Sequence, residues 1–166
     1  CHIGDKSAME RMRSLRQLSE KHNYTLLCRD LSELSNYAKV DNATYRQLKQ
    51  HTPGAFTFIL NATKEVPKRL IQPKKKTIGM RVPDNAILLA ILEELNEPLM
   101  STSLIMPGDD LPLSDPYDIR QTLEHSLDLV IDGGYCGLEA TTVLDLTDEE
   151  VVLLRQGVGD AAAFLE

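Results

Sequence analysis

The chain has no long apolar run and few cysteines, and both absences narrow the possible classes of protein. No apolar stretch approaches the roughly 18 residues that a membrane-spanning helix needs, so we expect no membrane segment or membrane partner. The three cysteines, Cys1, Cys28 and Cys136, lie far apart and form no C-x-x-C pair. This spacing argues against a disulfide framework or a zinc site. Unpaired cysteines also favour a reducing, cytoplasmic location.

Several common catalytic signatures are absent as well. The sequence contains no G-x-x-x-x-G-K-[ST], no G-x-S-x-G and no H-E-x-x-H. The stretch "GVGD" at 157–160 is similar to part of a dinucleotide-binding loop but lacks the strand-to-helix setting, so it predicts a turn. The histidines are scattered without ligand spacing, and we therefore expect no metal site built by the protein itself. Any magnesium would arrive bound to a nucleotide.

What the chain does contain is the composition and length of one domain. It has 166 residues, of which 42% are hydrophobic and 26% charged, so residues 1–166 are expected to form a single domain. Helical and strand patterns alternate along it, which predicts an α/β (α+β) fold around a twisted mixed sheet. We expect helices at 7–18, from Asp30, at 41–51, at 85–95 with Asp84 as cap, and from Pro116, and strands at 24–28, 55–60, 77–82, 98–106, 127–132, 141–146 and 150–155.

Charge is distributed unevenly along the chain. Residues 1–81 hold 16 Lys and Arg against 7 acids, a net charge of +9, whereas residues 82–166 carry a net charge of −16. The densest basic stretch, "KEVPKRLIQPKKKTIGMR" at 64–81, could attract a triphosphate or an RNA backbone. The alternative is an ordinary solvated loop, since lysines beside proline are common on surfaces.

Hydroxyl and arginine side chains recur where the expected strands end. The stretch "PLMSTSLIMPG" places Ser101, Thr102 and Ser103 in an apolar strand, and a hydroxyl buried without a partner costs about 1–3 kcal/mol. These hydroxyls therefore indicate an internal network or a ligand. Arginine forks and short hydroxyls suit phosphate binding, although each also occurs at ordinary strand positions. The other such positions are Thr57, Arg81, Thr141, Thr142 and Arg155.

Five short stretches of the sequence together resemble a known protein family. "PGAFTFIL", "TIGMRVP", "EPLMSTS", "TTVLDL" and "LLRQGVGD" stand in the order and spacing of the YrdC-like family, the threonylcarbamoyl-AMP synthases, and the chain most resembles its YciO branch. The resemblance covers essentially the whole chain. It implies a twisted open mixed sheet with flanking helices and a concave basic groove. It also implies condensation of threonine, bicarbonate and ATP, with Mg²⁺, into threonylcarbamoyl-adenylate for modification of tRNA (t6A), and binding of tRNA or double-stranded RNA.

The resemblance also implies roles for particular residues. Arg16 matches the lysine of the family's K-x-R motif, which would hold the ATP phosphates. The implied nucleotide-binding residues are Arg16, Thr57, Arg81, Ser101, Ser103, Thr142 and Arg155. The implied RNA-binding residues are Lys68, Arg69, Lys74, Lys75 and Lys76. No catalytic residue is assigned.

The sequence departs from the family pattern in three respects. Leu18 stands where the K-x-R motif has its arginine, and His22 replaces another basic residue. Ile105 stands where the S-x-N motif has asparagine. The chain also lacks the strand, helix and P-T-D-T-x-Y-like loop with which the family opens, so we expect a shortened N-terminus.

Two functions from different classes follow. The first is an enzyme of threonylcarbamoyl chemistry, either a synthase or a hydrolase that removes threonylcarbamoyl from tRNA. The second is a nucleotide- or RNA-binding module without catalysis. A structural relic with no ligand is a third interpretation. The sequence leaves the oligomeric state open, with a dimer as one option.

Overall fold

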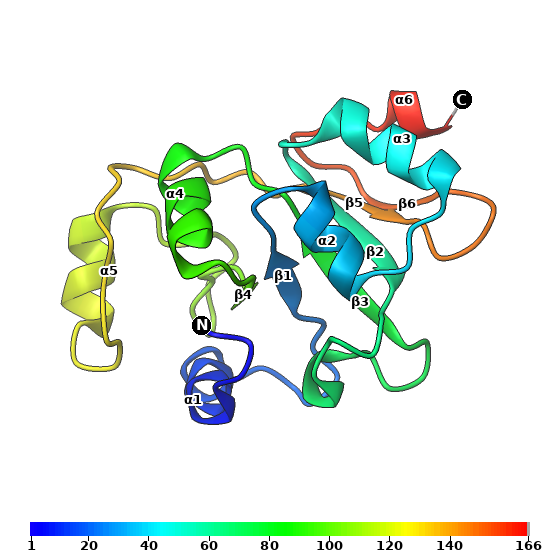
Figure 1. Cartoon of the computed structure of the whole chain (residues 1–166). Helices are drawn as coiled ribbons and strands as arrows, with labels where there is room; N and C mark the ends of the chain where they lie inside the picture. Colours follow the sequence, from blue (N-terminus) through cyan, green and yellow to red (C-terminus); the bar gives the residue numbers. More distant parts are fainter. Residues whose placement is uncertain (166) are drawn as a thin grey trace.

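The computed structural model describes residues 1–165, and within them six strands form one mixed sheet. The strands run in the order β4-β1-β3-β2-β5-β6 (Figure 1). Their bounds are β1 Thr25–Leu27, β2 Phe56–Asn61, β3 Thr77–Arg81, β4 Leu99–Ser101, β5 Thr142–Asp145 and β6 Val152–Arg155. β1 pairs with β3 and β2 with β5 in parallel, whereas the β1–β4, β2–β3 and β5–β6 pairs are antiparallel. The expected α/β fold with a twisted, open mixed sheet is confirmed.

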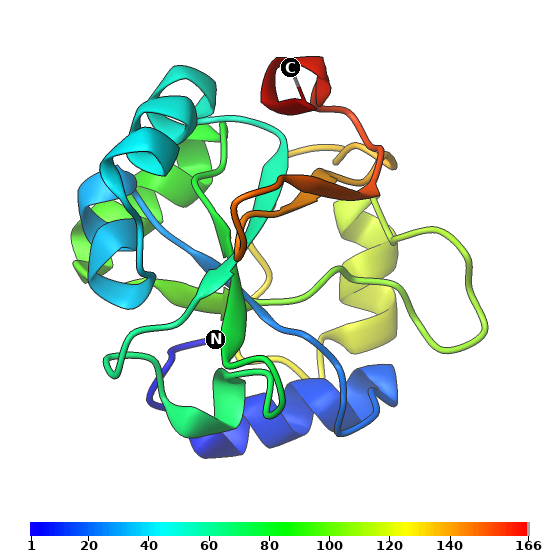
Figure 2. The ribbon, with the colours of Figure 1, turned by 90° about the vertical axis from the view of Figure 1, so that its right-hand side faces the viewer.

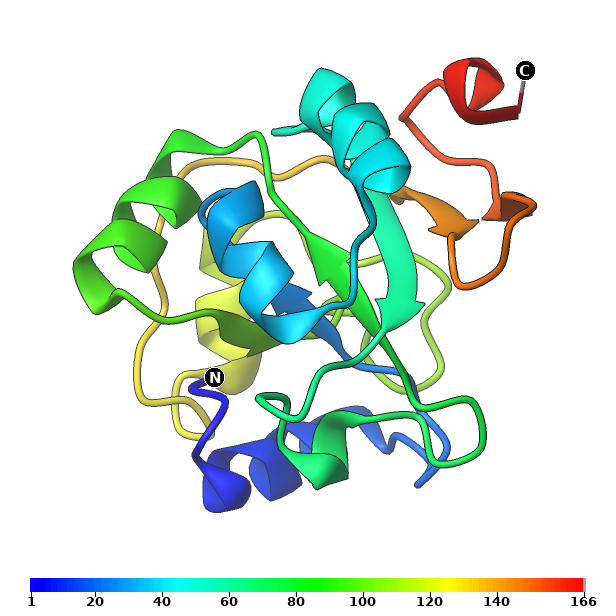
Figure 3. The same cartoon turned by 45° about the vertical axis from the view of Figure 1, so that its right-hand side comes forward.

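Helices flank this sheet on both sides and along one end. In Figure 2, α2, α3 and α4 lie on one side of the strands, α5 lies on the other side, and α1 runs along the lower end. Figure 3 shows the twist between the two long central strands, β2 and β3. The helices are α1 Lys6–Arg16, α2 Leu31–Tyr37, α3 Asn42–His51, the 3-10 helix η1 Lys68–Leu70, α4 Ala86–Leu95, α5 Pro116–Leu123 and α6 Ala162–Leu165. Within residues 1–165 no helix is both long and apolar enough to cross a membrane.

Local capping explains where most helices begin. Asp30 and Asp115 cap α2 and α5 as expected, each accepting a backbone N–H of the first turn. Two expectations are wrong by one or two residues. The helix expected from residue 7 begins at Lys6 with Asp5 as its cap, and Asn85, not the expected Asp84, caps α4.

Two expected strands also differ from the structure. The strand expected at 98–106 ends at Ser101, where its pairing with β1 stops at Thr25. Residues 127–132 form no strand. They belong to an irregular connection from α5 to β5, in which Leu129 and Ile131 are exposed. Alternating apolar residues predicted a strand there, but this segment does not pair with either edge strand of the sheet, β4 or β6.

The core lies between the sheet and the helices α2 and α3. Phe58, Leu60 and Met80 project from the central strands into this layer and are almost fully buried, as are Leu34 of α2 and Leu48 of α3. Side chains alternate between the two faces of a strand, so the neighbouring residues of the same strands point to the opposite face. That second face carries the cavity described next.

Candidate nucleotide-binding groove

A cavity of about 740 Å³ extends across the second face of the sheet and takes side chains from all six strands. Its floor contains Gly79 of β3, where an added Cβ would lie 2.9 Å from Thr25 Oγ1. The bare backbone at this position keeps the floor open. The charged lining residues are Arg16, Lys75, Arg81 and Arg155, with Asp145 as the carboxylate. The cavity is therefore basic and large enough for a nucleotide-sized ligand.

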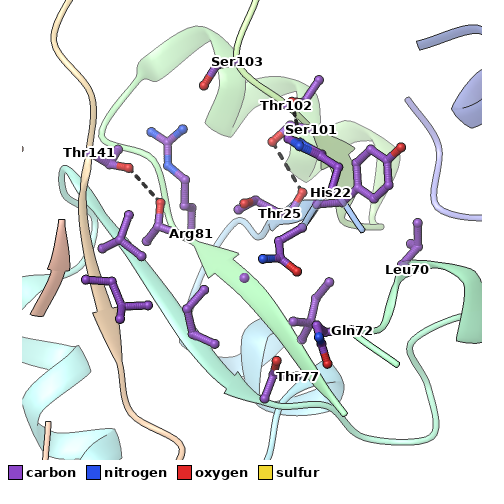
Figure 4. Close-up of a pocket in the computed structure, with 18 of the residues that line it drawn as sticks. His22, Thr25, Leu70, Gln72, Thr77, Arg81, Ser101, Thr102, Ser103 and Thr141 are labelled. Atoms are coloured by element: carbon purple, nitrogen blue, oxygen red, sulfur yellow. Dashed lines mark hydrogen bonds between the residues drawn. The ribbon is translucent and has the colours of Figure 1, made fainter. Parts of the chain in front are cut away.

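Arg81 occupies the centre of this basic surface. It is the last residue of β3, and Figure 4 shows it between Thr141 on one wall and the Ser101–Thr102 segment on the other. Its Nε is buried and has no hydrogen-bond partner among residues 1–165. Burial, and secondarily the charge of Arg155, lower the pKa of Arg81 from its ordinary value. A desolvated guanidinium beside a like charge is stabilised when an anion enters the cavity.

Arg155, Thr57 and Thr141 form the wall next to Arg81. Arg155 Nε donates to the carbonyl oxygen of Thr141 at 3.0 Å, and its Nη2 donates to Thr141 Oγ1 at 3.3 Å. Thr141 Oγ1 also shares a 2.8 Å hydrogen bond with Thr57 Oγ1. These contacts hold the Arg155 side chain in place and leave its remaining donor, Nη1, for a ligand.

The opposite wall contains the three consecutive hydroxyl residues at 101–103 that the sequence analysis identified. Thr102 Oγ1 accepts a 2.7 Å hydrogen bond from Arg16 Nη1 and lies 3.1 Å from His22 Nε2. Ser101 makes one long contact, 3.4 Å from its Oγ to the carbonyl oxygen of Thr25, and Ser103 is exposed. Thr102 thus belongs to a hydrogen-bonded network in the cavity lining, and Ser101 and Ser103 line the same cavity with fewer hydrogen bonds to protein groups.

The cavity brings together six of the seven expected nucleotide-binding residues, and Thr142 is the exception. Thr142 is fully buried on the core side of β5, where its hydroxyl donates to the carbonyl oxygen of Gly159 and accepts from the amide of Gly157. Its neighbour Thr141 faces the cavity instead. Sequence reasoning also assigned no role to several polar residues of the lining, namely Asn23, Thr25, Gln72, Thr77 and Asp145. Strand alternation would have linked Thr77 to Arg81, four positions apart on one face.

The five expected RNA-binding residues are all exposed. Lys74, Lys75 and Lys76 occupy a tight turn before β3, in which Lys75 N donates to Gln72 Oε1 at 2.6 Å and Lys76 N to the Gln72 carbonyl oxygen at 2.9 Å. Of the five residues, Lys75 lines the cavity. Lys68 and Arg69 lie in η1, and Arg69 donates a hydrogen bond to the carbonyl oxygen of Ile3.

Leu18 and Ile105, two of the departures from the family motifs, have different structural effects. Leu18 is half-buried and packs against the hydrophobic core, so it does not line the cavity. Ile105 does line it, and its carbonyl oxygen accepts a 2.7 Å hydrogen bond from Arg16 Nε. Arg16 is therefore held at two of its donors by Ile105 and Thr102, and burial lowers its pKa.

Comparisons with known proteins agree with this fold. The chain belongs to the family described as "Telomere recombination", the Sua5/YciO/YrdC domain, whose model matches residues 1–157. YciO of Escherichia coli is 58% identical over 165 residues, which cover 99% of this chain and 80% of that protein. Its crystal structure superposes with a TM-score of 0.93 at 57% identity, again covering 99% and 80% of the two chains.

More distant relatives carry a functional name. A threonylcarbamoyl-AMP synthase of Nitrosococcus oceani is 28% identical over 134 residues, 80% of this chain and 71% of the relative. The crystal structure of Pyrococcus abyssi Sua5 complexed with L-threonine has a TM-score of 0.84 and covers 95% of this chain and 46% of its own, at 23% identity. That structure shares the fold. The chain is thus a member of the YrdC/YciO family with distant similarity to the synthases.

Proposed function

We propose that the groove binds ATP, delivered with Mg²⁺, and that the protein acts in threonylcarbamoyl chemistry. The reaction would join threonine, bicarbonate and ATP into threonylcarbamoyl-AMP and release pyrophosphate. The observation that carries the proposal is the desolvated Arg81 guanidinium, which lies near Arg155 in the cavity lining and has no partner for its Nε among residues 1–165. A phosphate group would supply the missing acceptor and separate the two like charges.

The chemistry required of this groove is mainly positioning and charge stabilisation. Adenylate formation needs the carbamate oxygen in line with the α-phosphorus, and it needs cations near the leaving pyrophosphate. Arg81, Arg155, Ser101 and Ser103 all line the cavity, and Figure 4 shows the two serines on the side of Arg81 away from Thr141. These groups can contact the phosphates and the sugar of a bound nucleotide from both sides.

A second candidate is a protein that binds tRNA, or removes threonylcarbamoyl from it, without synthesising the adenylate. Leu18 favours this candidate because it packs into the core where the synthases have an arginine fork. Loss of one charge-assisted contact costs about 1.5–3 kcal/mol. The exposed lysines at 74–76 would then guide the RNA backbone to the cavity.

The first experiment supplies the protein with ATP, Mg²⁺, threonine and bicarbonate and detects threonylcarbamoyl-AMP by mass spectrometry, with a family synthase as positive control. Product, and its loss in Arg81→Gln, would support the synthase proposal. No product from a protein that consumes threonylcarbamoyl-modified tRNA would support the second candidate. A protein that neither binds ATP nor changes either substrate would refute both enzymatic functions.

A further inference from the structure

Three side chains on one wall of the cavity form a connected set that the proposed phosphate contacts do not use. Arg16 Nη1 donates to Thr102 Oγ1 at 2.7 Å, and His22 Nε2 lies 3.1 Å from the same oxygen. The His22 ring also packs edge-on against Tyr24, with 5.1 Å between the ring centroids. His22 lies in the segment between α1 and β1, and Thr102 is the residue directly after β4. Figure 4 shows His22 and Thr102 side by side.

The hydrogen-bond donors and acceptors that Arg16, Thr102 and His22 possess determine where the protons lie among them. A guanidinium can only donate, so Thr102 Oγ1 is the acceptor from Arg16. The threonine hydroxyl still has its own proton, and the neutral imidazole has one nitrogen that accepts. A hydroxyl that accepts from a cation becomes a stronger donor, because the two hydrogen bonds polarise each other. This favours the arrangement Thr102 Oγ1–H to His22 Nε2, with the ring proton of His22 on Nδ1.

The surroundings of His22 favour its neutral form, which keeps one ring nitrogen as a hydrogen-bond acceptor. Burial, and secondarily the charge of Arg16, lower the pKa of His22 from its ordinary value. The imidazole is therefore neutral near pH 7. The other charged side chains that line the same cavity are Lys75, Arg81, Arg155 and Asp145.

We propose that Thr102 and His22 form a proton relay that acts as the general base of the groove, with Arg16 as a positioning residue. This inference rests on the proposed function, because both candidate reactions need a base that removes a proton from the nucleophile. Synthesis must remove a proton from the threonine amine, and removal of the threonylcarbamoyl group must take one from water. In each case the nucleophile presents its proton to the remaining lone pair of Thr102 Oγ1.

The protons and electron pairs of this relay balance without any further reactant. As the lone pair of the nucleophile forms its bond to the carbonyl carbon, its proton passes to Thr102 Oγ1 and the hydroxyl proton passes to His22 Nε2. The positive charge then resides on the imidazolium. When the leaving group departs with its bonding electrons, the same two steps in reverse return the proton to it.

Nitrogen NMR of the ¹⁵N-labelled parent protein tests the geometry without any variant. We expect His22 to be neutral at pH 7, with its proton on Nδ1 and with Nε2 as the acceptor. Thr102→Val should shift the Nε2 resonance, because it removes the hydroxyl. A neutral His22 with its proton on Nε2 would overturn the relay, as would a charged His22 at pH 7.

Kinetics test the role. His22→Gln keeps an acceptor for the Thr102 hydroxyl but cannot take up a proton, so kcat should fall at least 100-fold while KM changes only a few-fold. The acid limb of the pH–rate profile should disappear in the same variant. Thr102→Ser keeps the relay and should remain within about tenfold of the parent, a loss far smaller than the 10²–10⁴-fold contribution of a general base. Lys49→Gln, on the exposed part of α3 outside the cavity, is the matched control.

The outcomes separate the relay from the proposed function. Turnover by the parent with an unchanged acid limb in His22→Gln would overturn the relay and leave the proposed function standing. No turnover by the parent on either set of substrates would overturn the catalytic function, and the relay with it.

Discussion

Arg81→Gln should raise the stability of the protein while it weakens ATP binding. The substitution removes a desolvated charge, the repulsion from Arg155 and a buried Nε that has no partner among residues 1–165. A buried unsatisfied donor costs about 1–3 kcal/mol. Some packing of the side-chain stem is lost, so we expect a net gain of about 1 kcal/mol in the free energy of unfolding. For a chain of this length that corresponds to about 2–4 °C in melting temperature.

Binding should change in the opposite direction. Loss of one charge-assisted contact of about 1.5–3 kcal/mol weakens ATP affinity roughly 10- to 150-fold. Urea unfolding measures the first effect and isothermal titration calorimetry with Mg-ATP the second. Lys74→Gln is the charge-matched control, because Lys74 is exposed and does not line the cavity. A variant that is less stable than the parent and binds ATP equally well would show that Arg81 is a structural residue, and the reasoning would fail.

Three further predictions concern other parts of the molecule. Replacing Lys74, Lys75 and Lys76 by Ala should reduce the slope of log K against log salt for duplex RNA by up to about 2.7, as measured by fluorescence anisotropy, and an unchanged slope would exclude this turn as the contact. Phe58→Ala should cost about 3–5 kcal/mol in urea unfolding, because the ring is fully buried and packs on two other phenylalanines, and a loss below about 1 kcal/mol would contradict that packing. His22 has a lowered pKa in the folded state, so below about pH 6.5 the unfolded chain takes up a proton more readily than the folded protein. The free energy of unfolding should therefore decrease as the pH is lowered below about 6.5. His22→Gln should flatten this part of the curve, and an equal pH dependence in the variant would assign it to other groups.

Much of the fold could be predicted because the strongest patterns coincide with paired strands. The stretches at 55–60, 77–82 and 141–146 match β2, β3 and β5 to within one or two residues, and each of these strands has a partner on both sides. Residues 127–132 have a comparable pattern but do not pair with the sheet, so local preference did not decide their structure. A strand also requires a partner, and the sequence of one segment does not reveal whether that partner exists.

The candidate site was predictable by residue type but not in its register. Adjacent threonines at 141 and 142 look equivalent in the sequence, yet strand alternation sends Thr141 to the cavity and Thr142 to the core. Which of these two threonines faces the cavity depends on where β5 begins. The pairing of Thr142 with Phe56 of β2 sets this boundary. The same limit applies to Leu18, because the left-handed residue Gln17 ends α1 before it and the chain then turns Leu18 toward the core.

The cavity takes its lining from residues as far apart in the chain as Arg16 and Arg155, and this has a practical consequence. A molecule that fills this cavity would contact residues from distant parts of the chain, which come together only in the folded sheet. Its binding energy therefore adds to global stability, by about 2.7 kcal/mol at a concentration 100 times its dissociation constant. A melting-temperature increase of about 5–10 °C should follow. Simple thermal-shift screening of metabolites and nucleotides can therefore find the natural ligand without any assay of turnover.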